Sequence, residues 1–169
     1  MATQTAYPDS GLSGAVVLIT GALTGIGRAT ALAFAKEGSR IVVSGRRQKE
    51  GADFATELQA MGVEAEFIYA DVRQEKDLES LIQRTVGKFG RLDIAVNNAA
   101  TEGKPGPIDT GMFDRFAGSP ESKERTKAKL PVQRLGKAEE VANTIVYIGS
   151  NSAPFLTGQS IVVDGGRSL

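Results

Sequence analysis

The sequence predicts an α/β protein with a doubly wound parallel sheet of about five strands and helices on both faces. Three observations lead to this class. Short β-branched runs alternate with segments of helical periodicity, several helical segments stop at a glycine, and a glycine-rich turn follows the first strand. A right-handed crossover can lay the last strand beside the fourth, so the expected strand order is 3-2-1-4-5.

Each expected element follows from a local pattern. Strands are expected in the short apolar, β-branched runs Ala15–Thr20, Arg40–Ser44, Glu64–Ala70, Leu92–Val96 and Ser160–Asp164. Helices are expected where apolar residues recur every three or four positions, at Gly25–Glu37, Gln48–Met61, Gln74–Phe89 and Lys137–Ile148. Between Ala99 and Arg134 the periodicity fails and glycines and prolines predict a long loop region, with a short helix near Pro120–Lys129.

Composition narrows the classes of function. The chain has 169 residues, a formal net charge of zero and neither cysteine nor histidine, which excludes disulfides, thiolate nucleophiles, Cys/His metal sites and imidazole bases. Balanced charge gives no case for a nucleic-acid or membrane partner. We expect an N-terminal tail over residues 1–11, a single domain over residues 12–169 and a cytoplasmic location.

The turn after the first strand is the first candidate site. Its glycines, Gly21, Gly25 and Gly27, are spaced Gly-x3-Gly-x-Gly, with a strand before them and a helix after them. Such a turn lets the backbone approach a pyrophosphate and points the N–H groups of the helix start at its charge. On this interpretation a methyl group on Gly21 or Gly27 would stand between backbone and ligand. The alternative is a tight turn without a ligand.

Several ordered motifs together resemble the short-chain dehydrogenase/reductase family. They are the turn Thr20–Gly27, Asp71-Val72, Asn97-Asn98-Ala99-Ala100, Pro105–Thr110, Gly136–Ala142 and Thr157–Gly166. The resemblance implies a Rossmann-type domain that binds a nicotinamide dinucleotide, and Ala100 departs from it where the family has glycine. It assigns cofactor contacts to Gly21, Leu23, Thr24, Gly25, Ile26, Gly27, Arg46, Asp71, Val72, Asn98, Ala99, Ile108 and Thr110. Asp71 has an equally good alternative role in capping the turn before the next helix.

The family's catalytic groups are missing. Its Tyr-x3-Lys pair and serine lie between the segments that resemble Asn97–Ala100 and Pro105–Thr110, which only four residues separate here. The chain's tyrosines, Tyr7, Tyr69 and Tyr147, are followed four positions later by Gly, Arg and Asn. We therefore assign no catalytic residue. An internal deletion near residues 101–107 explains the loss; the alternative is a sequence from which a segment was left out.

Two functions remain open after this loss. The first is an NADP-dependent oxidoreductase that transfers hydride between a small carbonyl compound and an alcohol, with the missing groups supplied elsewhere. The second is a truncated, inactive dinucleotide-binding module, with a homo-oligomer as a further possibility. NADP is favoured over NAD because Gly45 stands where an acid would accept ribose hydroxyls and Arg46 can hold a 2′-phosphate. The alternative for Arg46 is a solvated loop residue.

Overall fold

The structure is a computed structural model that describes residues 10–100 and 106–169. Most of the expected N-terminal tail and most of the proposed deletion point, residues 101–107, lie outside the described residues. Leu12 is fully buried, and its carbonyl accepts a hydrogen bond of 2.8 Å from the Ser39 hydroxyl. The packed part of the chain therefore includes Leu12.

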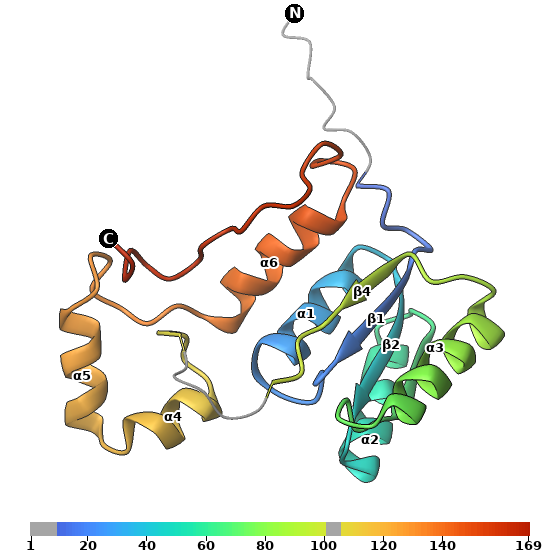
Figure 1. Cartoon of the computed structure of the whole chain (residues 1–169), viewed down its shortest axis with the longest axis horizontal. Coiled ribbons are helices and arrows are strands. Elements are labelled where there is room, and N and C mark those ends of the chain that lie inside the picture. Colours follow the sequence, from blue (N-terminus) through green and yellow to red (C-terminus); the bar gives the residue numbers. More distant parts are fainter. Residues whose placement is uncertain (1–9, 101–105) are drawn as a thin grey trace, which may run out of the picture.

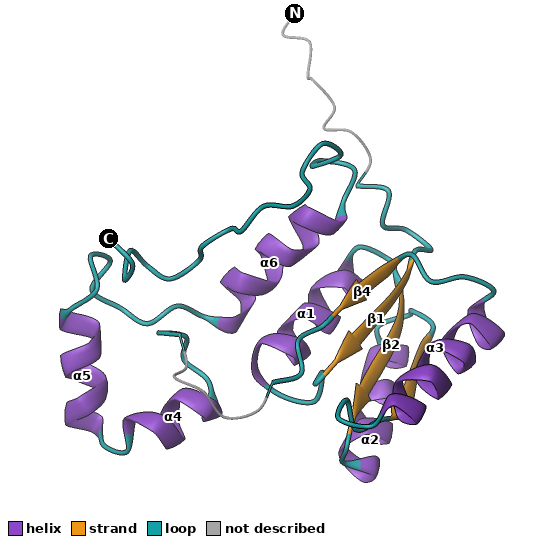
Figure 2. Cartoon of the chain, viewed as in Figure 1, coloured by secondary structure: helices purple, strands orange, loops and turns teal. Residues whose placement is uncertain are grey.

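The sheet has four parallel strands in the order β3-β2-β1-β4 (Figure 2). Their bounds are β1 Val16–Thr20, β2 Arg40–Gly45, β3 Ala65–Tyr69 and β4 Ile94–Val96. Val17 of β1 lies opposite Ile41 on one side and Ile94 on the other, which fixes the register. The doubly wound parallel class is confirmed.

Helices cover the sheet unequally. The helices are α1 Gly25–Lys36, α2 Gln48–Ala60, α3 Glu75–Phe89, α4 Gly111–Ala117, α5 Pro120–Ala128 and α6 Ala138–Gly149 (Figure 1). Residues of α1, α2 and α6 pack on one face, and α3 packs on the other. Helices α4 and α5 belong to a separate small cluster around Phe113, Leu130 and Leu135.

Strand alternation explains why the centre of the sheet is apolar throughout. Ile41 and Val43 of β2 pack toward Phe34 of α1, whereas Val42 packs toward Leu81 of α3. All of these side chains are fully buried or nearly so. A strand covered on both faces has no solvent side, so consecutive apolar residues are what its position requires.

Helix α4 was not expected from the sequence. Thr110 supplies its start, because the hydroxyl oxygen accepts a hydrogen bond from the N–H of Phe113, and Gly118 ends it in the left-handed conformation. The helix is only seven residues long and amphipathic over too few positions for periodicity to show it.

No helix within the described residues is long and apolar enough to cross a membrane.

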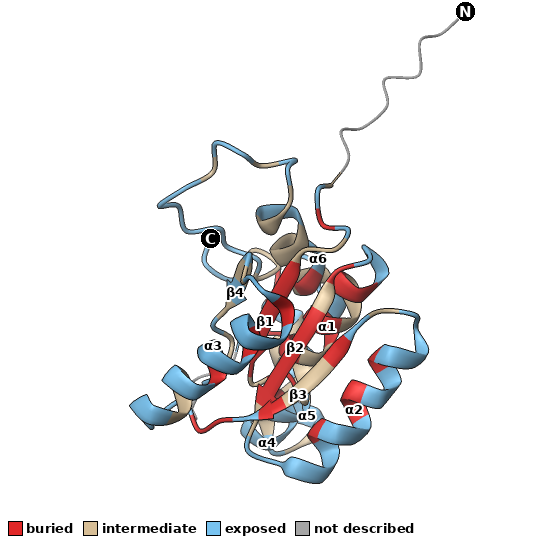
Figure 3. Cartoon of the chain, turned by 90° about the vertical axis from the view of Figure 1, so that its right-hand side faces the viewer, coloured by how far each residue is buried: buried red, intermediate tan, exposed pale blue. Residues whose placement is uncertain are grey.

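The expectation of a fifth strand over Ser160–Asp164 was wrong. This segment is irregular, and Ile161, Val162 and Val163 are 43%, 65% and 37% exposed. Figure 3 shows the chain that leads to the C-terminus mostly in the pale blue of exposed residues. Contacts hold the chain on both sides of it: the Asn151 N–H donates to the Ser10 carbonyl at 2.8 Å, and Gly166 lies against Pro131. A segment with strand propensity forms a strand only where it can pair with the edge of a sheet. These contacts keep the segment away from β4.

A stability prediction follows from Gly87, which lies inside α3 and has open space around the position of a side chain. Gly87→Ala should raise the free energy of unfolding by about 0.5–1 kcal/mol, because alanine loses less backbone entropy in a helix. Urea denaturation followed by circular dichroism measures this change. A destabilised variant would contradict the helix interior described here.

Candidate functional site

Four loops meet at the carboxyl end of the sheet. They are the glycine turn after β1, Arg46 after β2, Asp71-Val72 after β3 and Asn97–Ala99 after β4. Strands of a parallel sheet all present their carboxyl ends at the same edge, where open α/β folds bind ligands. Residues far apart in the sequence thus share one end of the molecule.

The glycine turn leads into α1 with a tight backbone path. Gly21 and Gly25 have φ angles of 64° and 56°, which favour glycine. The N–H of Ala22 donates to the carbonyl of Ser44 in β2 at 3.1 Å, so the turn is held against the neighbouring strand. Thr24 precedes α1 without a side-chain cap, and the first turn of α1 holds no acidic residue. The start of α1 therefore presents N–H groups and positive dipole potential to an anion.

Asn98 joins β4 to this turn. Its amide nitrogen donates to the carbonyls of Thr20 and Gly21 at 3.0 and 3.1 Å. The N–H of Ala99 donates to the Thr20 hydroxyl oxygen at 3.2 Å, and that hydroxyl lies 3.4 Å from the carbonyl oxygen of Val96. The double-asparagine segment is thus positioned by the first strand and its turn.

The structure shows a packing reason for glycine at positions 21 and 27. A methyl group on Gly21 would lie 2.8 Å from the Cα of Ala99, and one on Gly27 would lie 2.4 Å from the Asn98 amide nitrogen. These glycines are required because the β4 loop packs directly on the turn. The protein's own atoms already exclude a side chain at both positions, and the contact of these glycines with a cofactor stays a prediction.

Ile108 and Thr110 reach the same site from the later part of the chain. Gly136 holds their loop: its N–H donates to the Pro107 carbonyl, and its carbonyl accepts from the Asp109 N–H, both at 2.8 Å. Ile108 is buried, and the Thr110 methyl group lies 3.5 Å from where a side chain on Gly25 would begin. The loop therefore stands directly beside the start of α1.

Arg46, Asp71 and Val72 form the other end of the site. The Arg73 side chain donates from Nε to the two Asp71 carboxylate oxygens at 2.9 and 3.1 Å, and its Nη2 pairs with the same group. The hydrogen bonds from the Arg73 side chain and backbone N–H lower the pKa of Asp71 to about 2, and the charge of Arg46 acts in the same direction. Asp71 thus stabilises its own turn, and Arg73 is the partner that the sequence reading missed.

The remaining predicted residues differ in how far they are buried. Leu23 and Ile26 are half-buried, Thr24 is exposed, and Val72 is exposed after β3. Leu23 crowds Gly45, since a side chain there would begin 3.0 Å from the Leu23 Cδ1 atom. The structure brings the turn, Asn98, Ala99 and Thr110 together, and places Arg46 and Asp71 near each other at the next strands.

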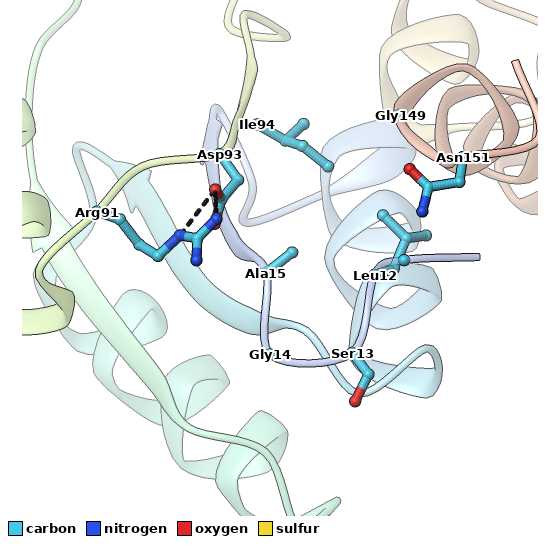
Figure 4. Close-up of a pocket in the computed structure, with 10 residues that line it drawn as sticks. Leu12, Ser13, Gly14, Ala15, Arg91, Asp93, Ile94, Gly149 and Asn151 are labelled. Atoms are coloured by element: carbon cyan, nitrogen blue, oxygen red, sulfur yellow. Dashed lines mark hydrogen bonds and ion pairs between the residues drawn. The ribbon is translucent and has the colours of Figure 1, made fainter. Parts of the chain in front are cut away.

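A separate cavity lies at the opposite, amino-terminal end of the sheet. It has a volume of about 360 Å³, and Arg91, Asp93 and Asn151 are among the residues that line it (Figure 4). Arg91 donates to one Asp93 oxygen at 2.8 Å and the Val16 N–H donates to the other at 2.8 Å. Burial would raise the pKa of Asp93, but these hydrogen bonds outweigh it and the pKa is lowered. Both carboxylate oxygens therefore serve the fold.

Both tyrosines among the described residues lie at the surface. Tyr69 ends β3 with its side chain exposed, and Tyr147 lies exposed in the last turn of α6. Neither is followed by a lysine four positions later. No group of metal-ligating side chains forms in the part of the chain that the structure describes.

The packing of the turn makes a stability prediction. Gly21→Ala and Gly27→Ala should each lower the free energy of unfolding by about 1–3 kcal/mol, because the added methyl group meets backbone or the Asn98 amide. Chemical denaturation measures the loss, with Gly87→Ala as the matched control in open space. Unchanged stability in both turn variants would contradict the close contact with Asn98 and Ala99.

Comparison with known proteins gives the family. A model described as short chain dehydrogenase matches residues 15–117, and one described as enoyl-(acyl carrier protein) reductase matches residues 104–168. An uncharacterized oxidoreductase of Thermotoga maritima is 27% identical over 247 positions, covering 92% of this chain and 98% of the relative. A short chain dehydrogenase/reductase of Aspergillus oryzae is 41% identical over 98 residues, which are 57% of this chain and 38% of that protein.

The fold comparison agrees. The structure of L-sorbose reductase from Gluconobacter frateurii complexed with NADPH and L-sorbose has a TM-score of 0.83 at 22% identity, covering 94% of this chain and 98% of that chain. With four of the curated relatives, the matched stretch spans only 32% to 38% of the relative's own length. The family model covers well over half of the residues, and the chain belongs to the short-chain dehydrogenase/reductase family.

Proposed function

We propose that this chain is an NADP(H)-binding module of its family that carries no proton-transfer group of its own. The observation behind the proposal is a contrast. Asn98 is hydrogen-bonded to the glycine turn at the carboxyl end of the sheet, while the sequence lacks a Tyr-x3-Lys pair. Family membership supports a nicotinamide dinucleotide as the ligand.

The described residues fit such a ligand along the carboxyl edge. The uncapped start of α1, with Gly25, Ile26 and Gly27, would hold the pyrophosphate through N–H groups. Asn98 and Ala99 contact the same turn, and Thr110 lies beside Gly25. The family resemblance assigns a cofactor contact to Asn98 and Ala99 and places the loop with Ile108 and Thr110 beside the nicotinamide. Asp71 and Val72, two strands away, would flank the adenine.

Arg46 supports NADP rather than NAD. It is exposed, and within the described residues no carboxylate pairs with it, whereas Arg73 is committed to Asp71. Arg46 nevertheless lies near enough to Asp71 to affect its pKa, which puts its charge at the carboxyl end of the sheet. Gly45 offers no carboxylate to ribose hydroxyls, and Leu23 crowds that position. An arginine side chain that no carboxylate binds, next to a position without an acidic side chain, favours binding of the 2′-phosphate of NADP.

The chemistry of the bound cofactor would be hydride transfer between a carbonyl compound and an alcohol. That reaction also needs a proton at the substrate oxygen, and a positioned acid contributes typically 10²–10⁴-fold. The exposed Tyr69 and Tyr147 have no lysine at the family's spacing. This chain alone therefore binds the cofactor without completing the reaction.

A complete oxidoreductase is the second candidate, and one observation favours it. The alignment with the Thermotoga relative runs over 247 positions although the chain has 169 residues, so it contains a long gap in this chain. The two family models also overlap at residues 104–117, around the proposed deletion point. The intact mass of the natural protein separates the candidates: 17.8 kDa supports the module, and a mass larger by roughly 80 residues supports the enzyme.

The cytoplasmic location stays a prediction.

The cofactor preference is testable on the purified chain. NADPH should bind about ten-fold to a hundred-fold more tightly than NADH, and Arg46→Ala should remove most of the difference, because a charge-assisted bidentate contact is lost. Isothermal titration calorimetry measures the dissociation constants of both cofactors for the parent chain and for each variant. Arg47→Ala is the matched control, since Arg47 is the exposed neighbour in the same loop. Equal affinities for the two cofactors would remove the NADP assignment.

Activity provides an independent test. A preparation of verified mass should show no turnover of NADPH with ketones, nor of NADP with alcohols, above the background of a no-enzyme control. Absorbance at the reduced nicotinamide band follows the reaction. Robust turnover that copurifies with the 17.8 kDa chain would overturn the assignment of an inactive module.

A further inference from the structure

The strand β4 leaves one edge of the sheet open. It is the last strand in the order β3-β2-β1-β4, and within the described residues nothing pairs with its outer side. The Asp93 N–H donates to the Val16 carbonyl at 3.0 Å, so alternation along the strand turns the backbone groups of Ile94 away from β1. An edge of this kind is a template for another strand.

One side of β4 is also bare. Ile94 and Val96 pack against the cluster that includes α1 and α6, and alternation points Ala95 to the other face. Ala95 is exposed there, because α3 covers the sheet nearer to β1, β2 and β3. A strand added at this edge would find both free backbone groups and uncovered apolar surface.

The same chain contains a strand-forming segment without a partner. Residues Ser160–Asp164 include three consecutive β-branched side chains, all exposed. The hydrogen bonds of the described residues include none from the backbone of Ile161, Val162 or Val163. Exposed β-branched side chains on a backbone without hydrogen bonds can supply the strand that the open edge lacks.

The geometry favours a second copy over closure within one chain. The Asn151 N–H is bonded to the Ser10 carbonyl before the segment, and Gly165 and Gly166 lie against Val132 and Pro131 after it. These contacts hold the segment beyond α6, away from its own β4 (Figure 1). Its exposed side chains are accessible to another molecule as they stand, and a net charge of zero gives no long-range repulsion between copies.

We propose that two copies of this chain exchange Ser160–Asp164, each adding the segment as a strand to the β4 edge of the other. The exchange is reciprocal, so each copy uses its one open β4 edge and its one free segment. The contact is the same in both directions, which closes the assembly at two copies instead of extending it. The pairing would also cover Ala95 and remove the exposed apolar side chains from water.

The first test measures self-association of the full chain by light scattering over a range of micromolar concentrations. We expect a dimer. Val162→Pro removes a backbone donor in the segment, and Ala95→Lys places a charge beside the edge, so each should weaken association about ten-fold or more. Thr157→Pro, in the same exposed tail but outside the segment, is the control and should leave the dimer intact. A monomer at every concentration, open-ended growth, or equal effects of the two prolines would overturn the proposal.

The second test uses the absence of cysteine from the sequence. Chains carrying Ala95→Cys are mixed with chains carrying Ile161→Cys or Val162→Cys and oxidised gently. Because side chains alternate along a strand, one of the two mixtures should form a disulfide-linked dimer in clear preference to the other. Equal cross-linking in both mixtures, or none, would overturn strand pairing. A double variant that forms only a disulfide within one chain would overturn the exchange between copies.

Discussion

The hydrogen bonds from the Asn98 amide are the constraint on which the site depends. One nitrogen donates to the carbonyls of Thr20 and Gly21, so the end of β4 is tied to the end of β1 and to the turn that follows it. This contact leaves no room for a side chain on Gly21 or Gly27. The path of the turn, and with it the direction of α1, is set from β4. A ligand meeting the start of α1 therefore meets a surface that three strands have already positioned.

Much of the sheet could be predicted because its strands are covered on both faces and are therefore marked by short, continuous apolar runs in the sequence. Val16–Thr20 and Arg40–Gly45 are short apolar runs between glycine-marked turns, and both form where expected. The same holds for Glu75–Phe89, whose apolar stripe and terminal Gly90 in the left-handed conformation mark a helix and its end. These signals depend on neighbours within a few residues, which is why periodicity alone reveals them.

The remainder depended on contacts between distant residues. The sequence shows Arg73 two positions after Asp71, but only the folded turn shows that they pair and that no carboxylate among the described residues pairs with Arg46. Likewise, Ser160–Asp164 has strand propensity, but it can form a strand only next to the edge of a sheet. The contacts of Asn151 and Gly166 determine where the segment lies. The seven-residue α4 depends on a cap at Thr110 that no periodic pattern announces.

The packing of α6 on α1 gives ligand binding a long-range effect on folding. Ala142 of α6 is fully buried, and Gly149 lies against the ring of Phe34 in α1, so α6 has no support from the sheet comparable to that from α1. If a ligand binds the start of α1 in the folded protein and not in the unfolded chain, it stabilises every element that folds only when α1 is formed. Occupancy at the carboxyl edge would thus protect the amides of α6 from solvent exchange, although α6 contributes no predicted cofactor contact. The helix would report binding through thermodynamic linkage.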